Sequence, residues 1–481
     1  MVVRTSPVEQ LAVDSIDTIA RHVIRTRFAD LPEDAVEATC KFILDTLGVG
    51  IFGSSGPWVE ELISAQGGPP TSGVARVFAR SVTLGAASAA LCNAYQMHNS
   101  EFDCVHEGAV VHAVTCPLAV ALAEVDRQNI DAGIQVTGQQ LIRAIALGVD
   151  VACHLGVAST SGLKFFRPGT CGAFGATAAL AVLRDFDTAT LVSAFGIVHA
   201  QLCGTMQAHT EGSPLLGMQM GFNARNAVLA CDLAERGVPG PRNVLEGPFG
   251  YFALFESSHD LASVLPQLGQ QWRITEMAHK PFPSGRATHG IVDGCMTLRR
   301  THDIPPEAIT RVSARVPPLI HHLVGRPSLV DMDINYARLC AQFAAARILI
   351  AGDLVTEDFT PSRRSDPDTL ALAEKVQIIV DDNPDPNALT PVTVEIETLD
   401  GAHHEIAVDT VYGHPNNPMT RQDGLKKFRS NWQHAAVALG EDARERVIEQ
   451  VENLPAIVDT ARIIDDLIPL AVISQRLIFP N

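Results

Sequence analysis

The sequence has little positive charge for its size. Its 481 residues include 36 Lys and Arg against 54 Asp and Glu, which gives a net charge of −18. Nucleic acids and anionic membrane surfaces bind to basic faces, so we expect neither as a partner of this chain. A small anionic substrate remains compatible with this charge, because such a ligand contacts only a local cluster of Arg, Lys and His.

Paired cysteine motifs, long apolar runs and targeting signals are also missing. The ten cysteines are spread singly, and none form a Cys-x-x-Cys pair. This spacing argues against a zinc ribbon and favours free thiols in a reducing compartment. No apolar run approaches the roughly 18–20 residues that a membrane span needs. The first residues, Met1 to Glu9, show no apolar h-region and no cleavage site. We therefore expect a cytoplasmic location.

Strand patterns are nearly absent from residues 8–265. Apolar residues recur there at spacings of three and four, and hydrophobic residues make up 46% of the whole chain, enough for a large core. Glycine and proline mark several helix boundaries. This pattern predicts successive helices over residues 35–53, 83–98, 116–127, 139–155, 172–183 and 220–234.

The pattern changes near Trp272. Alternating or β-branched runs predict strands, with Asp400-Gly401 as a hairpin turn between the last two, and helical spacing returns from Asp423 to the end. We therefore predict a mainly α protein. Its large all-helical domain is formed by residues 1–268 and 413–481, and a smaller α+β lid domain is inserted at residues 269–412. Within the insert the predicted strands are 309–316, 376–380, 392–399 and 404–411, the helices 287–300 and 335–350, and the loop 381–388.

The densest polar cluster lies between two Ala-rich helices, at residues 98–112. It contains His98, Glu101, Asp103, His106 and His112. Apolar surroundings can move the pKa values of such groups toward neutrality, as proton transfer at carbon requires. A hydrated loop with capping residues is an equally simple interpretation. A metal site is a third, since histidine and carboxylate are metal ligands. No second motif completes a ligand set, so we expect no metal.

Two further clusters are basic. Arg167 precedes a Gly/Ala-rich helix whose unpaired N–H groups could hold a carboxylate. Lys280, Arg286 and His289 crowd the start of another helix and could form an anion pocket. A surface arginine and a surface basic patch are the plainer interpretations. Walker A, His-Glu-x-x-His and Gly-x-Ser-x-Gly motifs are absent from the sequence.

The order of these segments resembles the MmgE/PrpD family, which includes 2-methylcitrate dehydratase, cis-aconitate decarboxylase and iminodisuccinate epimerase. The resemblance extends over nearly the whole chain. It is specific for the family but not for one activity within it. The segments that carry it are residues 42–48, 101–112, 168–175, 244–252, 280–289 and 412–414.

The resemblance implies a helical domain plus a smaller lid domain, usually as a homodimer. The active site is then expected between the two domains, without metal or organic cofactor. The implied chemistry moves a proton beside a carboxylate. We accordingly expect a metal-independent lyase, a dehydratase or decarboxylase, that acts on a small di- or tricarboxylate such as 2-methylcitrate or cis-aconitate.

The resemblance also implies roles for single residues. His112 would move the proton with His106 close by, Glu101 and Asp103 would orient the histidines or act as base, and His289 would be a second acid. The residues expected to bind the substrate are Arg167, Thr170, Gln219, Lys280 and Arg286.

Several positions depart from the family pattern. Ala113 stands where a proline usually follows the last histidine of the loop, and Cys104 replaces a second aspartate. Arg167 stands where a histidine is common. Leu216 and Gln219 occupy a segment where tricarboxylate-processing members carry a lysine and often a histidine. A charge-assisted contact contributes about 1.5–3 kcal/mol, so the missing lysine indicates a substrate other than standard 2-methylcitrate or cis-aconitate.

Two alternatives stay open. An epimerase or isomerase of a small dicarboxylate also abstracts a proton at carbon, and it needs two acid/base groups that flank one carbon. His112 with His289 or Lys280 could supply them. The second alternative is a non-catalytic protein that binds a small acid as a sensor or scaffold.

Overall fold

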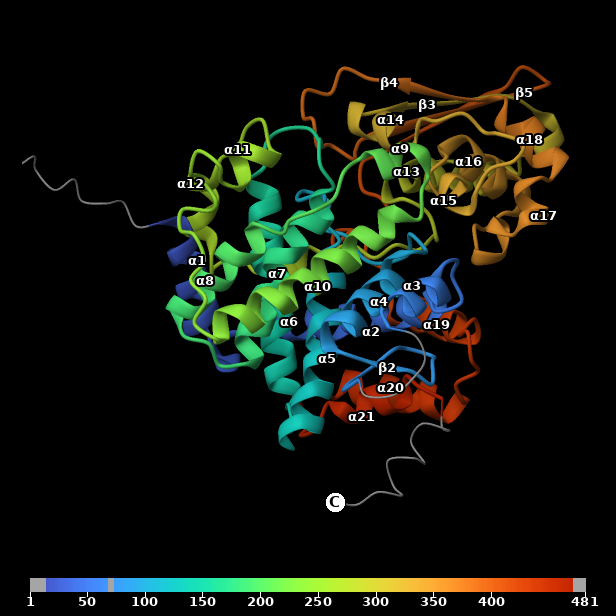
Figure 1. Ribbon diagram of the computed structural model, residues 1–481. Coiled ribbons are helices and arrows are strands. Elements are labelled where there is room, and N and C mark those ends of the chain that lie inside the picture. Colours follow the sequence, from blue (N-terminus) through green and yellow to red (C-terminus); the bar gives the residue numbers. More distant parts are fainter. Residues whose placement is uncertain (1–13, 68–72, 470–481) are drawn as a thin grey trace, which may run out of the picture.

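The computed structural model of the protein describes residues 14–67 and 73–469 (Figure 1). Helices dominate these residues, as the sequence predicts, and the fold is mainly α. The helices up to residue 264 are α1 (Ser15–Arg25), α2 (Glu33–Gly53), α3 (Val59–Ala65), α4 (Ala86–His98), α5 (Thr115–Ala132), α6 (Gly138–Ala158), α7 (Arg167–Leu183), α8 (Thr188–His199), α9 (Gln207–Glu211), α10 (Leu215–Glu235), α11 (Tyr251–Phe255) and α12 (Leu261–Val264). Two short strands, β1 (Ala75–Arg76) and β2 (Thr83–Leu84), form an antiparallel pair.

The middle of the chain contains a four-stranded sheet with helices. The strand order is β4-β3-β5-β6, and only the β3–β4 pair of this sheet is parallel. Helix α13 packs closely on β5, since a Cβ atom added to Gly290 or Gly294 would lie within 3.0 Å of Val392 or Val394. The strands are β3 (Ile309–Val316), β4 (Val376–Val380), β5 (Val392–Thr398) and β6 (His403–Val408). The helices are α13 (Arg286–His302), α14 (Pro318–Val324), α15 (Ile334–Arg338), α16 (Ala341–Ala351), α17 (Pro361–Arg364) and α18 (Pro367–Ala373).

The chain then returns to helices. Figure 1 shows this last segment, in red, beside the helices of the N-terminal half, and α19 and α20 both contact α2. Its helices are α19 (Arg421–Gln433), α20 (Glu441–Glu452) and α21 (Ala461–Asp466). Short 3₁₀ helices occur at Phe28–Asp30, Leu265–Gln267, Arg273–Glu276, Pro306–Ala308, Thr356–Phe359 and Leu454–Ala456.

Two separate hydrophobic cores account for this arrangement. The first core takes residues from both ends of the described chain, from Ile16 to Leu467. The second core runs from Phe282 to Ile396. We call residues 282–408 the α+β part and the rest the helical part. The boundaries predicted at 268/269 and 412/413, and the role of the α+β part as a lid, stay predictions; residues 1–13 and 470–481 lie outside the described residues.

Some sequence expectations differ from the observed elements. Helix α7 begins at Arg167 rather than at residue 172, because Pro168 fits the first helical turn. The helix predicted over 335–350 is divided into α15 and α16, and Leu339 between them packs into the first core. Strand β6 ends at Val408 rather than at residue 411. Helix α14, which begins at the second proline of Pro317-Pro318, was not predicted.

Helix α6 is mostly apolar, although it contains Arg143 and Asp150. By length and composition alone it is long and apolar enough to cross a membrane, so the expectation that no segment reaches this length is wrong for α6. The fold explains its composition, because 89% of the apolar window is buried inside the protein. In the first core α6 packs against α7, which is buried along its whole length.

Candidate active site

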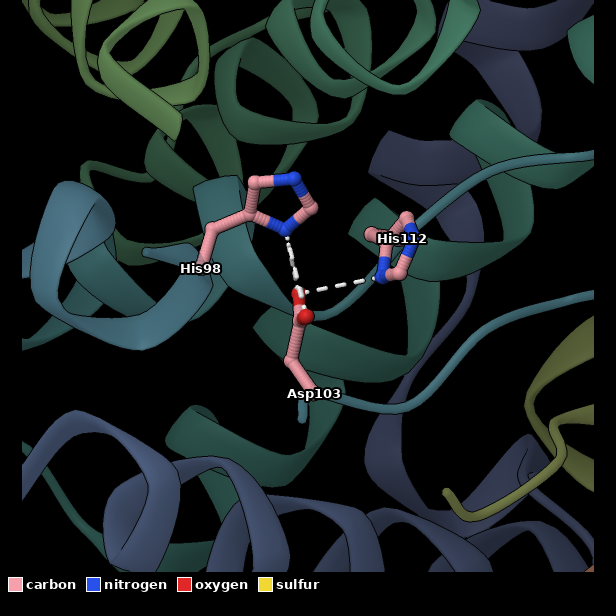
Figure 2. Close-up of side chains that lie close together, drawn as sticks. All are labelled: His98, Asp103 and His112. Atoms are coloured by element: carbon pink, nitrogen blue, oxygen red, sulfur yellow. Dashed lines mark hydrogen bonds and ion pairs between the residues drawn. The ribbon is translucent and has the colours of Figure 1, made fainter. Parts of the chain in front are cut away.

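The carboxylate of Asp103 lies between two imidazoles (Figure 2). His98 ends α4, and its Nδ1 lies 2.9 Å from Asp103 Oδ2. His112 precedes α5, and its Nδ1 lies 3.1 Å from the same oxygen, an ion-pair contact outside hydrogen-bond geometry. The two rings meet edge to face, with centroids 4.6 Å apart. One buried carboxylate thus contacts two histidines from the two ends of a loop.

Neighbouring helices hold this loop in place. The hydroxyl of Thr115, the first residue of α5, donates a hydrogen bond of 2.7 Å to Asp103 Oδ2. Lys427 of α19 donates to the carbonyl oxygen of Phe102 at 2.8 Å and forms an ion pair with Asp45 of α2 at 2.7 Å. Glu101 has a left-handed backbone with φ of 52°. Such a conformation persists only where the surroundings fix it, and clusters at functional sites.

The charges in this cluster and its burial shift the pKa values of the two histidines in opposite directions. Burial opposes ionisation of Asp103, but His112 and His98 outweigh it and hold the pKa of Asp103 well below its ordinary value. Burial also disfavours the imidazolium of His98, yet Asp103 and Glu101 outweigh burial and raise its pKa. For His112 burial prevails, and its pKa is lowered. The cluster therefore favours the proton on His98 over His112.

Glu101 forms a second buried pair beside this cluster. Its Oε2 accepts a hydrogen bond of 2.9 Å from Lys280 Nζ, and the Lys280 side chain is fully buried. Burial opposes ionisation of Glu101, but Lys280, His98 and His112 outweigh it and lower its pKa to about 2. A carboxylate with so low a pKa is a weak base at neutral pH. Glu101 is thus better suited to holding Lys280 than to abstracting a proton.

A pocket opens beside these residues, between the helical part and the α+β part. Its volume is about 70 Å³, and most of its wall is apolar. Leu323, Val324 and Leu389 contribute to the wall from the α+β part. The polar side chains of the wall are His98, Glu101, His112, His209 and Arg286. Of the residues predicted to act in the site, Glu101, His112 and Arg286 line this pocket, while Asp103 and Lys280 contact its wall.

Two predicted catalytic histidines lie outside the wall of this pocket. His106 Nε2 lies 2.7 Å from Glu276, and its Nδ1 accepts a hydrogen bond from the backbone N–H of Ala109. The ring of His289 is fully buried, with Nε2 3.1 Å from the carbonyl oxygen of Ser284 and Nδ1 3.4 Å from the Arg286 guanidinium. Both nitrogens of each ring are engaged in these contacts. Their predicted roles as acids or bases stay predictions.

Three predicted substrate-binding residues are likewise engaged elsewhere. Arg167 forms a two-fold contact with Glu256, at 2.9 and 3.0 Å. The Thr170 hydroxyl lies 3.2 Å from that of Tyr251. Gln219 Oε1 accepts a hydrogen bond from a backbone N–H. Arg286 does line the pocket, but its guanidinium is paired with Glu107 at 2.6 Å.

Family models match both halves of the chain. The MmgE/PrpD N-terminal domain matches residues 17–263, and the MmgE/PrpD C-terminal domain matches residues 282–454. The chain belongs to the MmgE/PrpD family. It is 25% identical to the cis-aconitate decarboxylase of Homo sapiens over 92% of each chain. It is 26% identical to the cis-aconitate decarboxylase of Aspergillus terreus over 88% of this chain and 89% of the relative.

Two residues of this MmgE/PrpD site were not among the predicted site residues. His98 belongs to the polar cluster of residues 98–112, but sequence spacing does not show that it shares Asp103 with His112. Only the fold of the loop brings the three together. His209 lies on the short helix α9, outside every polar cluster of the sequence. The contact that marks it, with Arg326 of the α+β part, joins residues far apart in the chain.

The donor set of His98, Asp103 and His112 is also one that a metal ion could use, since the ligand atoms lie within 4.8 Å of one another. Histidine nitrogen and carboxylate oxygen suit Zn²⁺ and related ions. One oxygen of Asp103 contacts both imidazoles and accepts a hydrogen bond from Thr115. Among the described residues, His98 Nε2 and His112 Nδ1 have no hydrogen-bond partner.

Proposed function

We propose that this MmgE/PrpD protein is a lyase that acts on a small di- or tricarboxylate without metal or organic cofactor. One observation carries the proposal. The Asp103 carboxylate lies between His98, which tends to keep its proton, and His112, which tends to lose it, and both rings line the same pocket. The names of the relatives make decarboxylation of cis-aconitate the first reaction to test. Dehydration of 2-methylcitrate is the second.

In a decarboxylation, the bond between a carboxylate carbon and its neighbour breaks, and CO₂ leaves. The electron pair of that bond stays on the remaining carbon, which takes a proton from the His98 imidazolium. The neutral imidazole then regains a proton from water. Asp103 stabilises the imidazolium before transfer, as a buried carboxylate beside a histidine does.

In a dehydration both rings act, on neighbouring carbons. Neutral His112 removes a proton from the carbon beside a carboxylate, and the electron pair forms the new double bond. The hydroxyl group leaves with the proton of His98 as water. Dehydration therefore needs one protonated and one neutral histidine, and the charges around Asp103 favour the proton on His98 over His112. Decarboxylation needs only the protonated His98.

Proton NMR of chelator-treated protein in D₂O tests the proposal. The substrates are cis-aconitate, 2-methylcitrate, citrate and iminodisuccinate. We expect new vinyl or methylene signals from loss of CO₂ or water, and we expect a His112→Asn variant with an unchanged circular dichroism spectrum to lack the signals of water loss. Deuterium incorporation without net product would indicate an epimerase, and binding without conversion would indicate a carboxylate sensor. Turnover that requires an added divalent metal would contradict the metal-independent mechanism.

We also propose that the protein acts as a homodimer, as the family resemblance implies. Light scattering coupled to size-exclusion chromatography measures the mass in solution. A mass of about twice 51.5 kDa is expected, and a mass of one chain would contradict the proposal.

A further inference from the structure

Arg326 of the α+β part reaches across to His209 of the helical part. Its Nη2 donates to the His209 carbonyl oxygen at 2.9 Å and lies 3.3 Å from His209 Nδ1. The guanidinium also stacks over the Tyr336 ring, with its carbon 5.0 Å from the ring centroid. His209 lines the pocket beside the Asp103 cluster. Residues of the two parts are thus joined at the wall of the pocket.

This contact selects one tautomer of His209. An arginine only donates hydrogen bonds, so Nδ1 of His209 must accept and the ring proton must lie on Nε2. Burial, and after it the charge of Arg326, lower the pKa of His209 to about 4, so the ring is neutral at pH 7. Nε2 forms no hydrogen bond within residues 14–67 and 73–469. His209 therefore has one N–H group to offer to a ligand in the pocket.

Arg326 differs from Lys280 and Arg286, two other cations near the pocket. Lys280 is paired with Glu101, and Arg286 with Glu107. In the described residues, Arg326 directs its side-chain hydrogen bonds to His209 and to the Leu323 carbonyl oxygen, and none to a carboxylate. Its Nη1 is buried and has no hydrogen-bond partner among them. The guanidinium charge is thus not neutralised by a direct ion pair.

We propose that His209 and Arg326 form a carboxylate subsite of the pocket. The Nε2–H of His209 donates to one carboxylate of the substrate, and Arg326 is the positioning residue that fixes the tautomer and supplies positive charge behind the ring. Leu216, whose apolar side chain lines the same pocket, supplies no charge there. The inference rests on the proposed function, since it assigns one carboxylate of the proposed substrate class.

Equilibrium binding of unreactive acids tests this subsite separately from turnover. Isothermal titration calorimetry compares tricarballylate, which has three carboxylates, with glutarate, which has two. We expect the wild-type protein to bind tricarballylate more tightly. In Arg326→Met and in His209→Leu this preference should fall by about 10- to 100-fold, the loss of one charge-assisted contact. Arg363→Met, an exposed arginine of the same part, is the matched control and should keep the preference.

The outcomes test the binding subsite independently of the proposed reaction. Loss of the preference in both variants, with melting temperatures near that of the control, supports the subsite even when no acid is turned over. An unchanged preference in folded Arg326→Met or His209→Leu overturns it, as does a wild-type protein that does not prefer tricarballylate. If Arg326→Met does not fold, Arg326→Lys and His209→Leu decide the question, since Lys keeps the charge and should retain part of the preference. Turnover of cis-aconitate by the wild-type protein is measured in parallel and tests the proposed function alone.

Discussion

At the scale of single residues, Asp103 controls the protonation of both histidines. The dehydration needs neutral His112 and protonated His98, whose pKa values lie below and above the ordinary 6.5, respectively. We therefore expect a bell-shaped pH profile of kcat/KM. Activity is lost on the acid side below 6.5, as His112 gains a proton, and on the alkaline side above 6.5, as His98 loses one.

The variant Asp103→Asn tests this control. Without the carboxylate the pKa values of both rings fall, so the alkaline limb should move to lower pH and kcat should drop about 100-fold or more. Stopped assays from pH 5 to 9, with circular dichroism as the check of folding, measure both effects. A profile that keeps its alkaline limb would show that His98 is not the acid.

The buried pair of Glu101 and Lys280 predicts a pH-dependent stability. The pKa of Glu101 is about 2 in the folded protein against 4.5 ordinarily, so its contribution to stability is full above 4.5 and is lost as the pH falls toward 2. Glu101→Gln leaves Lys280 buried without an opposite charge, and we expect a loss of about 3 kcal/mol at pH 7. Urea denaturation should show that this loss shrinks at pH 3.

An exposed pair provides the control for this measurement. Glu405 lies 2.8 Å from Arg315, and both side chains are about half exposed, at 55% and 48%. Glu405→Gln should change the stability by less than about 1 kcal/mol at either pH. A similar small effect in Glu101→Gln would mean that the buried pair does not stabilise the fold.

The sequence located the polar cluster of residues 98–112 but not the partners within it. His106 and His98 look equivalent in sequence, yet the backbone of His106 pairs with Val111 in a β-bridge, and its ring turns to Glu276. His98 is placed by the end of α4 instead. Which histidine reaches Asp103 depends on this folding of the loop, and residue spacing carries no signal of it.

At the scale of elements, helix α19 connects the C-terminal segment to the loop of Asp103. Lys427 bridges Asp45 of α2 and the carbonyl oxygen of Phe102, next to Asp103. In Lys427→Met, Asp45 is left as an unpaired buried carboxylate, so we expect a loss of about 3–5 kcal/mol in stability. Lys427→Met combined with Asp45→Asn should recover part of it.

Measurement of kcat distinguishes the two roles of Lys427, the ion pair with Asp45 and the hydrogen bond to Phe102. The double variant restores charge balance but not the hydrogen bond to Phe102, so its kcat should stay below that of the wild type while its melting temperature recovers. Exposed Lys426, the neighbour on α19, is the control position, and Lys426→Met should change neither quantity. Full kcat in the double variant would show that Lys427 stabilises the fold without positioning the loop.

Helix periodicity predicted most elements well because their apolar faces are long. The strands of the sheet were also found, since alternation in β5 buries Val392, Val394 and Ile396 on one face. The division between α15 and α16 was missed, because apolar residues continue through the break. Leu339 leaves the helical path there to reach the first core and the pocket, and that contact is long-range.

At the scale of the whole molecule, the pocket depends on how the two parts meet. The sequence indicated that both chain ends share one helical body, because helical spacing resumes after the strands. It could not show which surfaces of the two parts are in contact. The pocket of about 70 Å³ is small beside the roughly 300 Å³ or more of typical ligand sites, so we infer that the parts separate to admit a tricarboxylate.

Gly212 lies at this contact and permits a test of it. Its φ is +70°, and a Cβ atom at this position would lie 2.9 Å from the backbone N and Cα of Tyr336. Gly212→Ala therefore forces α15 away, and with it the ring on which Arg326 stacks. Gly133→Ala is the matched control, because its φ of +64° is similar but no atom lies within 4 Å of the added Cβ.

Both variants place alanine in a left-handed conformation, which costs about 1–2 kcal/mol, so both should melt at lower temperature than the wild type. Only Gly212→Ala should also weaken the binding of tricarballylate, several-fold, since only it disturbs the contact between the two parts. Differential scanning calorimetry and titration calorimetry measure the two effects. Equal affinity in both variants would show that the pocket does not depend on this contact, and would leave backbone strain as the sole effect of the substitution.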